Sequence, residues 1–208
     1  MNNIITIVDY GLGNLASVQN MIKKIGGRSI ISSSYKDINN SKKLILPGVG
    51  SFGKGMENIK SMELLEVLNE KVLIDKIPIL GICLGMQLMT KFSEEADVDG
   101  FGWFNAKTIK FDRDKLTDNL KIPHMGWSDV LIKSNERLFI GEKKDQRFYF
   151  VHSYHVDCED ENDIMAITKY GYYFPCAIAK GNILGVQFHP EKSHIFGMQF
   201  LKNFIYYL

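Results

Sequence analysis

The first hundred residues alternate short apolar runs with segments in which apolar residues recur every three or four positions. Such runs are typical of strands buried on both faces, and the longer spacing is typical of amphipathic helices. Strands are expected at 4–8, in a run ending at Leu46 and at 77–82, and helices at 15–26, 62–73 and 84–92. This alternation predicts an α/β fold with a mainly parallel sheet and helices on its faces.

After about Gly100 the pattern changes to shorter, strand-like pieces. They cover 103–111, 127–133, 147–156, 164–171 and 176–188, and a closing helix is expected at 193–208. Gly181-Asn182, inside the last of these strand pieces, has the composition of a hairpin turn. Neither an internal repeat nor a low-complexity linker interrupts the chain. We therefore expect one α/β domain over 1–208, with extra β-hairpins in its second half.

Composition narrows the possible functions. The 208 residues suffice for one large core, and 45% hydrophobic with 24% charged residues is typical of soluble globular proteins. A net charge of +1 with no long run of one sign favours neither nucleic acid nor a membrane surface as partner. No apolar run approaches the roughly 18 residues of a membrane span, and the first residues lack signal-peptide features. Three dispersed cysteines form no disulfide framework, which favours a cytoplasmic location.

Cys83 lies between the predicted strand at 77–82 and the predicted helix at 84–92, in the sequence GICLG. Its sulfur is therefore expected at the carboxyl end of a parallel sheet, the edge where ligands bind in open α/β folds. The flanking glycines match a nucleophile elbow, in which they allow a sharp turn and a close approach of strand and helix. A helix N-terminus or an imidazole can activate a thiol there. The structural alternative is a buried cysteine that only packs.

A nucleophile also needs a base that a third group orients. The segment GVQFHPEKS places His189 after an apolar run and Glu191 two residues further on, with Pro190 stiffening the link. Cys83, His189 and Glu191 therefore form a candidate triad. Taken alone, His189 would be interpreted as a surface-loop histidine, and only its combination with the elbow favours catalysis.

The glycine-rich segment LPGVGSFG follows the predicted strand that ends at Leu46. Glycine allows backbone N–H groups to turn toward a developing oxyanion, and one such donor is typically worth about 10²–10³ in rate. A plain turn, or an anion-binding loop at a helix start, is the alternative interpretation.

Taken together, these motifs resemble a known family. GICLGMQ and FHPE match the hallmarks of class I, triad-type glutamine amidotransferases. Within that class the chain is most similar to the glutaminase subunits of imidazole glycerol phosphate synthase, an enzyme of histidine biosynthesis. The resemblance runs nearly end to end, through IVDYGLGNLASV, LPGVGSFG, GICLGMQLM, PHMGWSDV, YFVHSYHV, GVQFHPEKS and FLKNF. It implies a flavodoxin-like, mainly parallel sheet with helices on both faces.

The resemblance also implies roles for individual residues. Cys83 would attack the side-chain amide of glutamine, while His189, oriented by Glu191, would protonate the leaving ammonia and then activate the water that hydrolyses the glutamyl thioester. The remaining implied contacts are to glutamine itself. The oxyanion hole would come from Gly48, Val49 and Gly50, in some relatives only after a peptide rearranges, and substrate contacts from Gln87, Ser153 and Tyr154.

The same resemblance implies a partner. Ammonia would pass into a (β/α)8-barrel cyclase subunit in a heterodimer, with Asn14, Tyr149 and Lys192 at the contact and no cofactor. The plain alternatives are that Asn14 caps the helix that follows it and that Lys192 is a solvated surface charge.

Two segments depart from the histidine-pathway pattern and leave the ammonia acceptor open. GFGWFNA (100–106) and IPHMGWSDV (122–130) resemble more closely the paralogous glutaminase subunits that serve nucleotide-sugar or surface-polysaccharide amidotransferases. Two further classes are a regulatory subunit with a dead site, which the intact Cys83, His189 and Glu191 argue against, and a free-standing cysteine hydrolase such as a γ-glutamyl hydrolase.

The remaining reactive side chains are interpreted as structural. Cys158 is expected in an exposed loop, and Cys176 is expected to pack in a strand. His152 and His155 alternate along a strand-like run and are expected to have structural roles. Because no histidines lie near Cys158 at metal-ligand spacing, no metal site is predicted.

Overall fold

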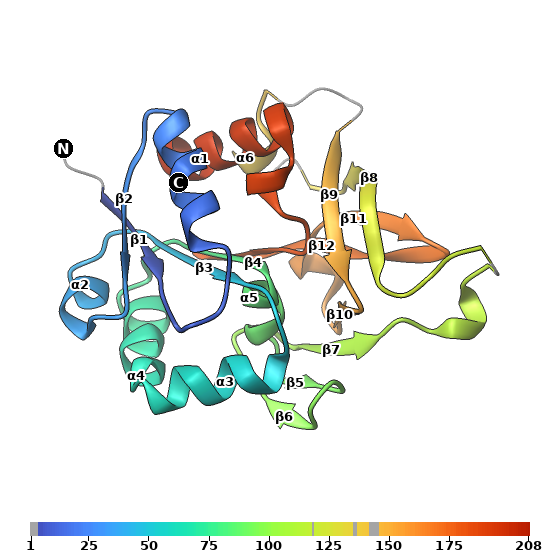
Figure 1. The fold of residues 1–208 in the computed structure, drawn as a ribbon, viewed down its shortest axis with the longest axis horizontal. Helices are drawn as coiled ribbons and strands as arrows, with labels where there is room; N and C mark the ends of the chain where they lie inside the picture. The colour runs from blue at the N-terminus through green and yellow to red at the C-terminus, as the bar shows by residue number, and fades with distance from the viewer. Residues whose placement is uncertain (1–3, 118, 135–136, 142–145) are drawn as a thin grey trace.

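A nine-stranded sheet forms the centre of the protein (Figure 1). The computed structural model describes residues 4–117, 119–134, 137–141 and 146–208. In order across the sheet, the strands are β2 (Arg28–Ser32), β1 (Ile4–Val8), β3 (Leu44–Gly48), β4 (Ile79–Cys83), β13 (Ile183–Val186), β12 (Tyr172–Lys180), β11 (Ile164–Tyr170), β8 (His124–Ile132) and β9 (Arg147–His152). The pairs from β2 to β13 are parallel, and the pairs from β13 to β9 are antiparallel.

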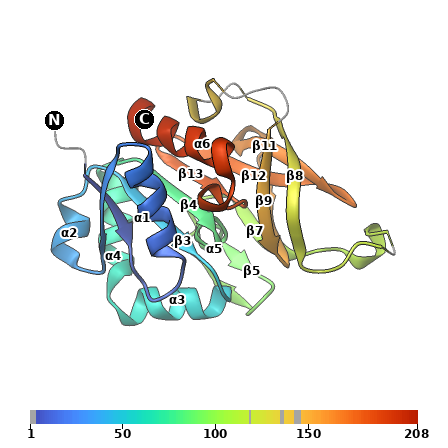
Figure 2. The ribbon, with the colours of Figure 1, turned by 45° about the horizontal axis from the view of Figure 1, so that its top comes forward.

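Helices cover both faces of the parallel half (Figures 1 and 2). On one face lie α1 (Leu15–Lys24) and α6 (His194–Tyr207), and on the other lie α2 (Tyr35–Asn39), α3 (Phe52–Ser61), α4 (Leu64–Asn69) and α5 (Leu84–Leu88). The residues of strand β3 are continuously apolar because both faces of the strand are buried. Ile45 packs on the side of α1 and α6, whereas Leu44 and Leu46 pack on the other side. The predicted α/β architecture, with helices on both faces, is confirmed.

A second sheet of four short strands lies beside the antiparallel half. Its order is β10 (Tyr154–Cys158), β7 (Ala106–Lys110), β5 (Phe92–Ser93) and β6 (Val98–Asp99). The run 147–156 was expected as one strand-like piece, but it divides at Ser153, with β9 in the large sheet and β10 in the small one. Ser153 therefore lies where the chain crosses from one sheet to the other.

Several boundaries differ from the predicted ones for local reasons. β3 extends through Pro47 to Gly48, because Gly48 pairs with Cys83 of β4. The helix predicted at 62–73 begins at Leu64 and continues as a π-helix over Glu70–Ile74. The helix predicted at 84–92 ends at Leu88, and Phe92 begins β5. The elements β2, α2 and α3 were not predicted.

The second half contains confirmed predictions and one error. Gly181, with a φ of +60°, turns the chain between β12 and β13 as the hairpin motif predicts. Cys176 is buried within β12, as expected. The prediction for Cys158 is wrong, since this residue ends β10, pairs with Ala106 and is half-buried. The closing helix forms as α6, and among the described residues no helix is both long and apolar enough to cross a membrane.

Candidate active site

Cys83 lies at a sharp turn between β4 and α5. Its backbone has a φ of +54° and a ψ of −110°, in a region that residues with a side chain rarely occupy. The flanking glycines are required by packing. A Cβ on Gly81 would lie 2.7 Å from the backbone nitrogen of Met86, and a Cβ on Gly85 would collide with the carbonyl oxygen of Leu46. The strand-to-helix turn predicted from GICLG is therefore present.

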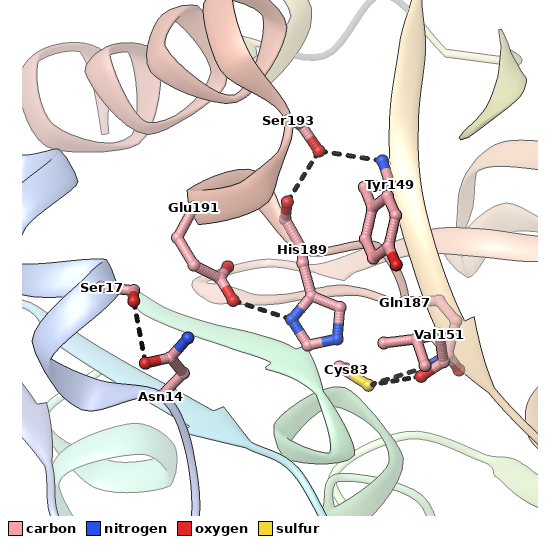
Figure 3. Close-up of polar contacts among 9 residues, drawn as sticks. All are labelled: Asn14, Ser17, Cys83, Tyr149, Val151, Gln187, His189, Glu191 and Ser193. Atoms are coloured by element: carbon pink, nitrogen blue, oxygen red, sulfur yellow. Dashed lines mark hydrogen bonds and ion pairs between the residues drawn. The ribbon is translucent and has the colours of Figure 1, made fainter. Parts of the chain in front are cut away.

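His189 and Glu191 form a buried pair above this turn (Figure 3). His189 Nδ1 lies 2.8 Å from Glu191 Oε1, and the two side chains are 1% and 2% exposed. The backbone between them is a short 3₁₀ turn over Pro190–Lys192. Ser193 Oγ donates to the carbonyl oxygen of His189 and accepts from the N–H of Tyr149, which fixes the turn against β9.

The free nitrogen of His189 points toward the Cys83 sulfur (Figure 3). Because Nδ1 faces the Glu191 carboxylate, Nε2 is the atom available for proton exchange, and it has no hydrogen-bond partner within the described residues. Burial lowers the pKa of His189, but the Cys83 sulfur and the Glu191 carboxylate outweigh burial and raise this pKa to about 10. The site therefore favours an imidazolium at His189, beside the Cys83 sulfur.

Two further groups contact the sulfur. The side-chain nitrogen of Gln187 lies 3.6 Å from Cys83 Sγ, and the carbonyl oxygen of Val151 lies 3.9 Å from it. Gln187 was not predicted as a site residue. A signal for it existed, because Gln187 and His189 are two positions apart in an extended run and such positions share a face.

A cavity of about 300 Å³ opens in front of Cys83. All but one of the predicted substrate contacts line it, namely Val49, Gly50, Gln87, Ser153 and Tyr154. The exception is Gly48, which lies buried behind the loop, where a Cβ would collide with the Tyr10 hydroxyl. His152 was predicted to be structural, yet it also lines the cavity.

Glu95 brings a carboxylate to the same cavity, although it belongs to none of the sequence motifs. Its Oε2 accepts a hydrogen bond of 2.7 Å from the backbone N–H of Phe52, at the start of α3. Nothing in the local sequence distinguishes Glu95 from its neighbour Glu94, because only the packing of α3 against the loop aims one of the two carboxylates inward.

None of the three predicted partner contacts lines the cavity, but Tyr149 and Lys192 are hydrogen-bonded through their backbones to His189, and Asn14 lies on the Glu191 side of the close-up (Figure 3). Lys192 is exposed, and its Nζ lies 5.8 Å above the ring of half-buried Tyr149. Asn14 does not cap α1 with its side chain, which instead accepts a hydrogen bond of 2.8 Å from the Ser17 hydroxyl. Asn14 does occupy the N-cap position of α1, where its carbonyl oxygen accepts from the N–H groups of Ser17 and Val18, so the helix-cap interpretation is confirmed for the backbone but not for the side chain.

A strained cysteine turn at the carboxyl edge of a parallel sheet, next to a histidine paired with a carboxylate, defines a class of α/β enzymes that act through a covalent intermediate. The particular family follows from comparison with known proteins. The chain matches the glutamine amidotransferase class-I family over residues 6–208 and belongs to that family.

Curated relatives extend along nearly the whole chain. It is 52% identical to "Imidazole glycerol phosphate synthase subunit HisH 2" of Methanococcus maripaludis, over 97% of this chain and 98% of that protein. It is 45% identical to the protein of the same name in Pseudomonas aeruginosa, with the same coverage. It is 47% identical to "Imidazole glycerol phosphate synthase subunit HisH" of Sulfurimonas denitrificans, over 98% of each chain.

Solved structures support the fold alone, because sequence identity to them is low. The structure of PurLQS from Thermotoga maritima aligns with a TM-score of 0.76 at 15% identity, over 100% of this chain and 99% of that one. The glutaminase domain of CTPS from Trypanosoma brucei aligns with a TM-score of 0.65 at 19% identity, over 97% of this chain and 93% of that one.

Proposed function

We propose that this chain is the glutaminase subunit of an imidazole glycerol phosphate synthase. It hydrolyses glutamine to glutamate and ammonia, and the ammonia passes to a (β/α)8-barrel cyclase subunit in a heterodimer. The end-to-end similarity to proteins of that name supports the pathway. The observation that supports hydrolysis by a cysteine nucleophile is the position of Cys83 at a strained turn beside the His189–Glu191 pair.

In this proposal the three residues act as a catalytic triad. The Cys83 thiolate attacks the side-chain amide carbon of glutamine, and His189 Nε2 protonates the departing ammonia as the carbon–nitrogen bond breaks. The neutral imidazole then removes a proton from water, which attacks the thioester and releases glutamate and the sulfur. Glu191 holds the imidazole in the orientation that presents Nε2 and stabilises its charged form.

The cavity offers a binding group for the ammonium end of an amino acid. Glu95 supplies a carboxylate that can bind the α-ammonium group of glutamine, and its hydrogen bond to Phe52 fixes its direction. The backbone of Val49 and Gly50, which line the cavity, supplies the oxyanion donors. Gln87, Ser153 and Tyr154 also line the cavity and position the substrate chain.

The cyclase contacts, in this proposal, the surface that carries Asn14, Tyr149 and Lys192. The side chains of Tyr149 and Lys192 stack beside the turn that holds His189 and Glu191. A partner that contacts this surface therefore reaches the turn that orients the base, which gives a route for coupling hydrolysis to the partner's substrate.

Glutamate release by the purified chain tests the proposal. We expect slow release by the chain alone and a strong increase when a cyclase-type barrel subunit from the same source and its formimino ribonucleotide substrate are both added. Cys83→Ala abolishes release, yet the variant complex still forms imidazole glycerol phosphate when ammonia is supplied. Retained glutamine hydrolysis in Cys83→Ala would rule out the nucleophile assignment.

A paralogous glutaminase that feeds a nucleotide-sugar or surface-polysaccharide amidotransferase is the second candidate. The segments at 100–106 and 122–130, which depart from the histidine-pathway pattern, are the observation that favours it. Part of the departing segment at 100–106 has a packing explanation, since buried Trp103 stacks on Phe101 and donates to Asn69. Slow hydrolysis that neither the cyclase nor its nucleotide changes would favour this alternative.

A further inference from the structure

The two contacts of the Cys83 sulfur favour opposite protonation states. A thiol can donate its proton to the carbonyl oxygen of Val151, so this oxygen favours the neutral form. An amide N–H donates to sulfur, and such a bond strengthens when the acceptor carries a negative charge. The side-chain nitrogen of Gln187 therefore favours the thiolate, provided that its amide is oriented with the nitrogen toward the sulfur.

That orientation follows from one acceptor whose identity is unambiguous, the carbonyl oxygen of Tyr154. Gln87 must turn its NH₂ group toward this oxygen, at 2.9 Å. The same nitrogen lies 3.0 Å from the side chain of Gln187, so Gln187 must present its oxygen there. The remaining end of the Gln187 amide, its NH₂ group, therefore faces Cys83.

A second chain of hydrogen bonds fixes the Tyr154 carbonyl from the other side. His152 Nδ1 donates to it at 2.8 Å, so His152 Nε2 is an acceptor for His124 Nδ1 at 3.0 Å. His124 Nε2 then accepts from the Ser128 hydroxyl at 2.8 Å. The carbonyl of Tyr154 has two lone pairs, and Gln87 and His152 occupy both. A continuous polar network thus runs from Ser128 on β8 to the nucleophilic sulfur.

Gln187 has no other evident role. Its side chain is 0% exposed, and it does not line the cavity, so it is not placed to bind glutamine. Burying an amide is costly unless both of its ends are satisfied. In this site one end is satisfied by Gln87 and the other by Cys83.

We propose that Gln187 is a catalytic residue whose side-chain amide donates a hydrogen bond to the Cys83 sulfur and stabilises it as a thiolate. The stabilisation acts before attack on glutamine and again when the carbon–sulfur bond of the thioester breaks and the sulfur departs. Gln187 transfers no proton, because His189 carries the proton to ammonia and takes one from water. The proposal rests on the proposed function in that Cys83 is the nucleophile.

Gln187→Met tests this role, since methionine has a similar volume and no donor. The measurement is the rate of Cys83 alkylation by iodoacetamide against pH, followed by peptide mass spectrometry. We expect the profile to move about one pH unit upward. The loss of a hydrogen bond to a charged group raises the pKa of the thiol by roughly one unit. For glutamine hydrolysis we expect kcat to fall about tenfold with little change in KM.

The other titratable groups around Cys83 remain in this variant. They are His189 with Glu191 from the turn after β13, Tyr10 after β1, His152 at the end of β9, and Glu95 on the cavity wall. Cys158 and Cys176 serve as internal references. Burial raises the pKa of the Cys158 thiol to about 12 and that of Cys176 well above its usual value, so neither reacts readily.

Asn203→Leu is the matched control. Asn203 is also a fully buried amide, but it lies in α6 and donates to the carbonyl oxygens of Leu138 and Ile140. We expect this variant to lose thermal stability while the alkylation profile of Cys83 stays in place. An unchanged profile in folded Gln187→Met would overturn the role of Gln187 and leave the nucleophile assignment intact. Hydrolysis by Cys83→Ala would instead overturn the nucleophile assignment on which the role of Gln187 rests.

A measurement on the wild-type side chain covers the case in which Gln187→Met does not fold. The amide proton of Gln187 that faces the sulfur is compared by NMR between the wild-type protein and Cys83→Ala. We expect an upfield change for this proton on loss of the acceptor, with the Asn203 side-chain amide as the unaffected reference. Identical Gln187 signals in the two proteins would contradict the hydrogen bond.

Discussion

The parallel and antiparallel halves of the sheet build the site by different means. The parallel half contributes backbone shape: the strained turn at Cys83, the glycines at 81 and 85, and the glycine-rich loop after β3. The antiparallel half and the segment after β13 contribute side chains, which hold one another through hydrogen bonds. The first kind of construction fails when a single carbon is added, and the second fails when a single donor or acceptor is lost.

The parallel half of the sheet, which shapes the site through its backbone, should tolerate substitution less well than the antiparallel half. We expect Gly85→Ala to destabilise the protein by at least about 3 kcal/mol or to prevent folding, because the added Cβ collides with the carbonyl oxygen of Leu46 inside a close-packed contact. Urea unfolding measures the change. Gly102→Ala is the control, since Gly102 has open space around its Cα, and its φ of +68°, unlike that of Gly85, lies in the left-handed region. It should cost about 1 kcal/mol, and equal losses in the two variants would contradict the packing argument.

Substitutions among the hydrogen-bonded side chains of the site should lower the rate of glutamine hydrolysis more than they lower the stability of the protein. We expect Glu191→Gln to lower kcat for glutamine about 10³-fold or more, with little change in KM, because the amide no longer favours the productive orientation and charge of His189. Steady-state kinetics measures this effect. Glu57→Gln, at an exposed ion pair with Lys54, should behave as the wild-type protein does. A large rise in KM with unchanged kcat in Glu191→Gln would instead assign Glu191 to substrate binding.

The smallest expected effect concerns pH and the histidine chain. Burial lowers the pKa of His124 to about 4, while in the unfolded chain this residue titrates near 6.5. As the pH falls from about 6.5 to 4 the unfolded chain binds the proton first, so stability present at neutral pH is lost over this window. We expect His124→Gln to cost about 1–3 kcal/mol at pH 7.5 and to lose less further stability on acidification than the wild-type protein.

Urea unfolding at pH 7.5 and pH 5 separates these two effects. His194→Gln carries the same substitution at an exposed histidine outside the network and should keep the wild-type difference between the two pH values. His152 and His155 also have pKa values lowered by burial and remain in both variants, so part of the acid sensitivity persists. An acid sensitivity identical in His124→Gln and the wild-type protein would contradict the contribution of His124.

Much of the fold follows from periodicity along the chain. The apolar runs of β1, β3 and β4 and the spacing of Val18 and Ile22 in α1 predict the parallel half with little help from tertiary contacts. β2 escaped prediction because it is an edge strand that alternates half-buried and exposed positions, so its pattern is weak. The break at Ser153 escaped prediction because two strands of different sheets follow one another in a single apolar run.

The sequence by itself determined those parts of the site whose geometry depends only on neighbouring residues in the chain. GICLG requires the turn at Cys83 because its glycines are the only residues that fit there, and HPE holds His189 and Glu191 within reach of one another. The alternation of an extended run puts Gln187 on the same face as His189, but only the tertiary structure decided that its amide meets the Cys83 sulfur and that His152 and Glu95 line the substrate cavity. Hydrogen bonds between groups many residues apart depend on how strands are ordered across a sheet, and no local pattern along the chain records that order.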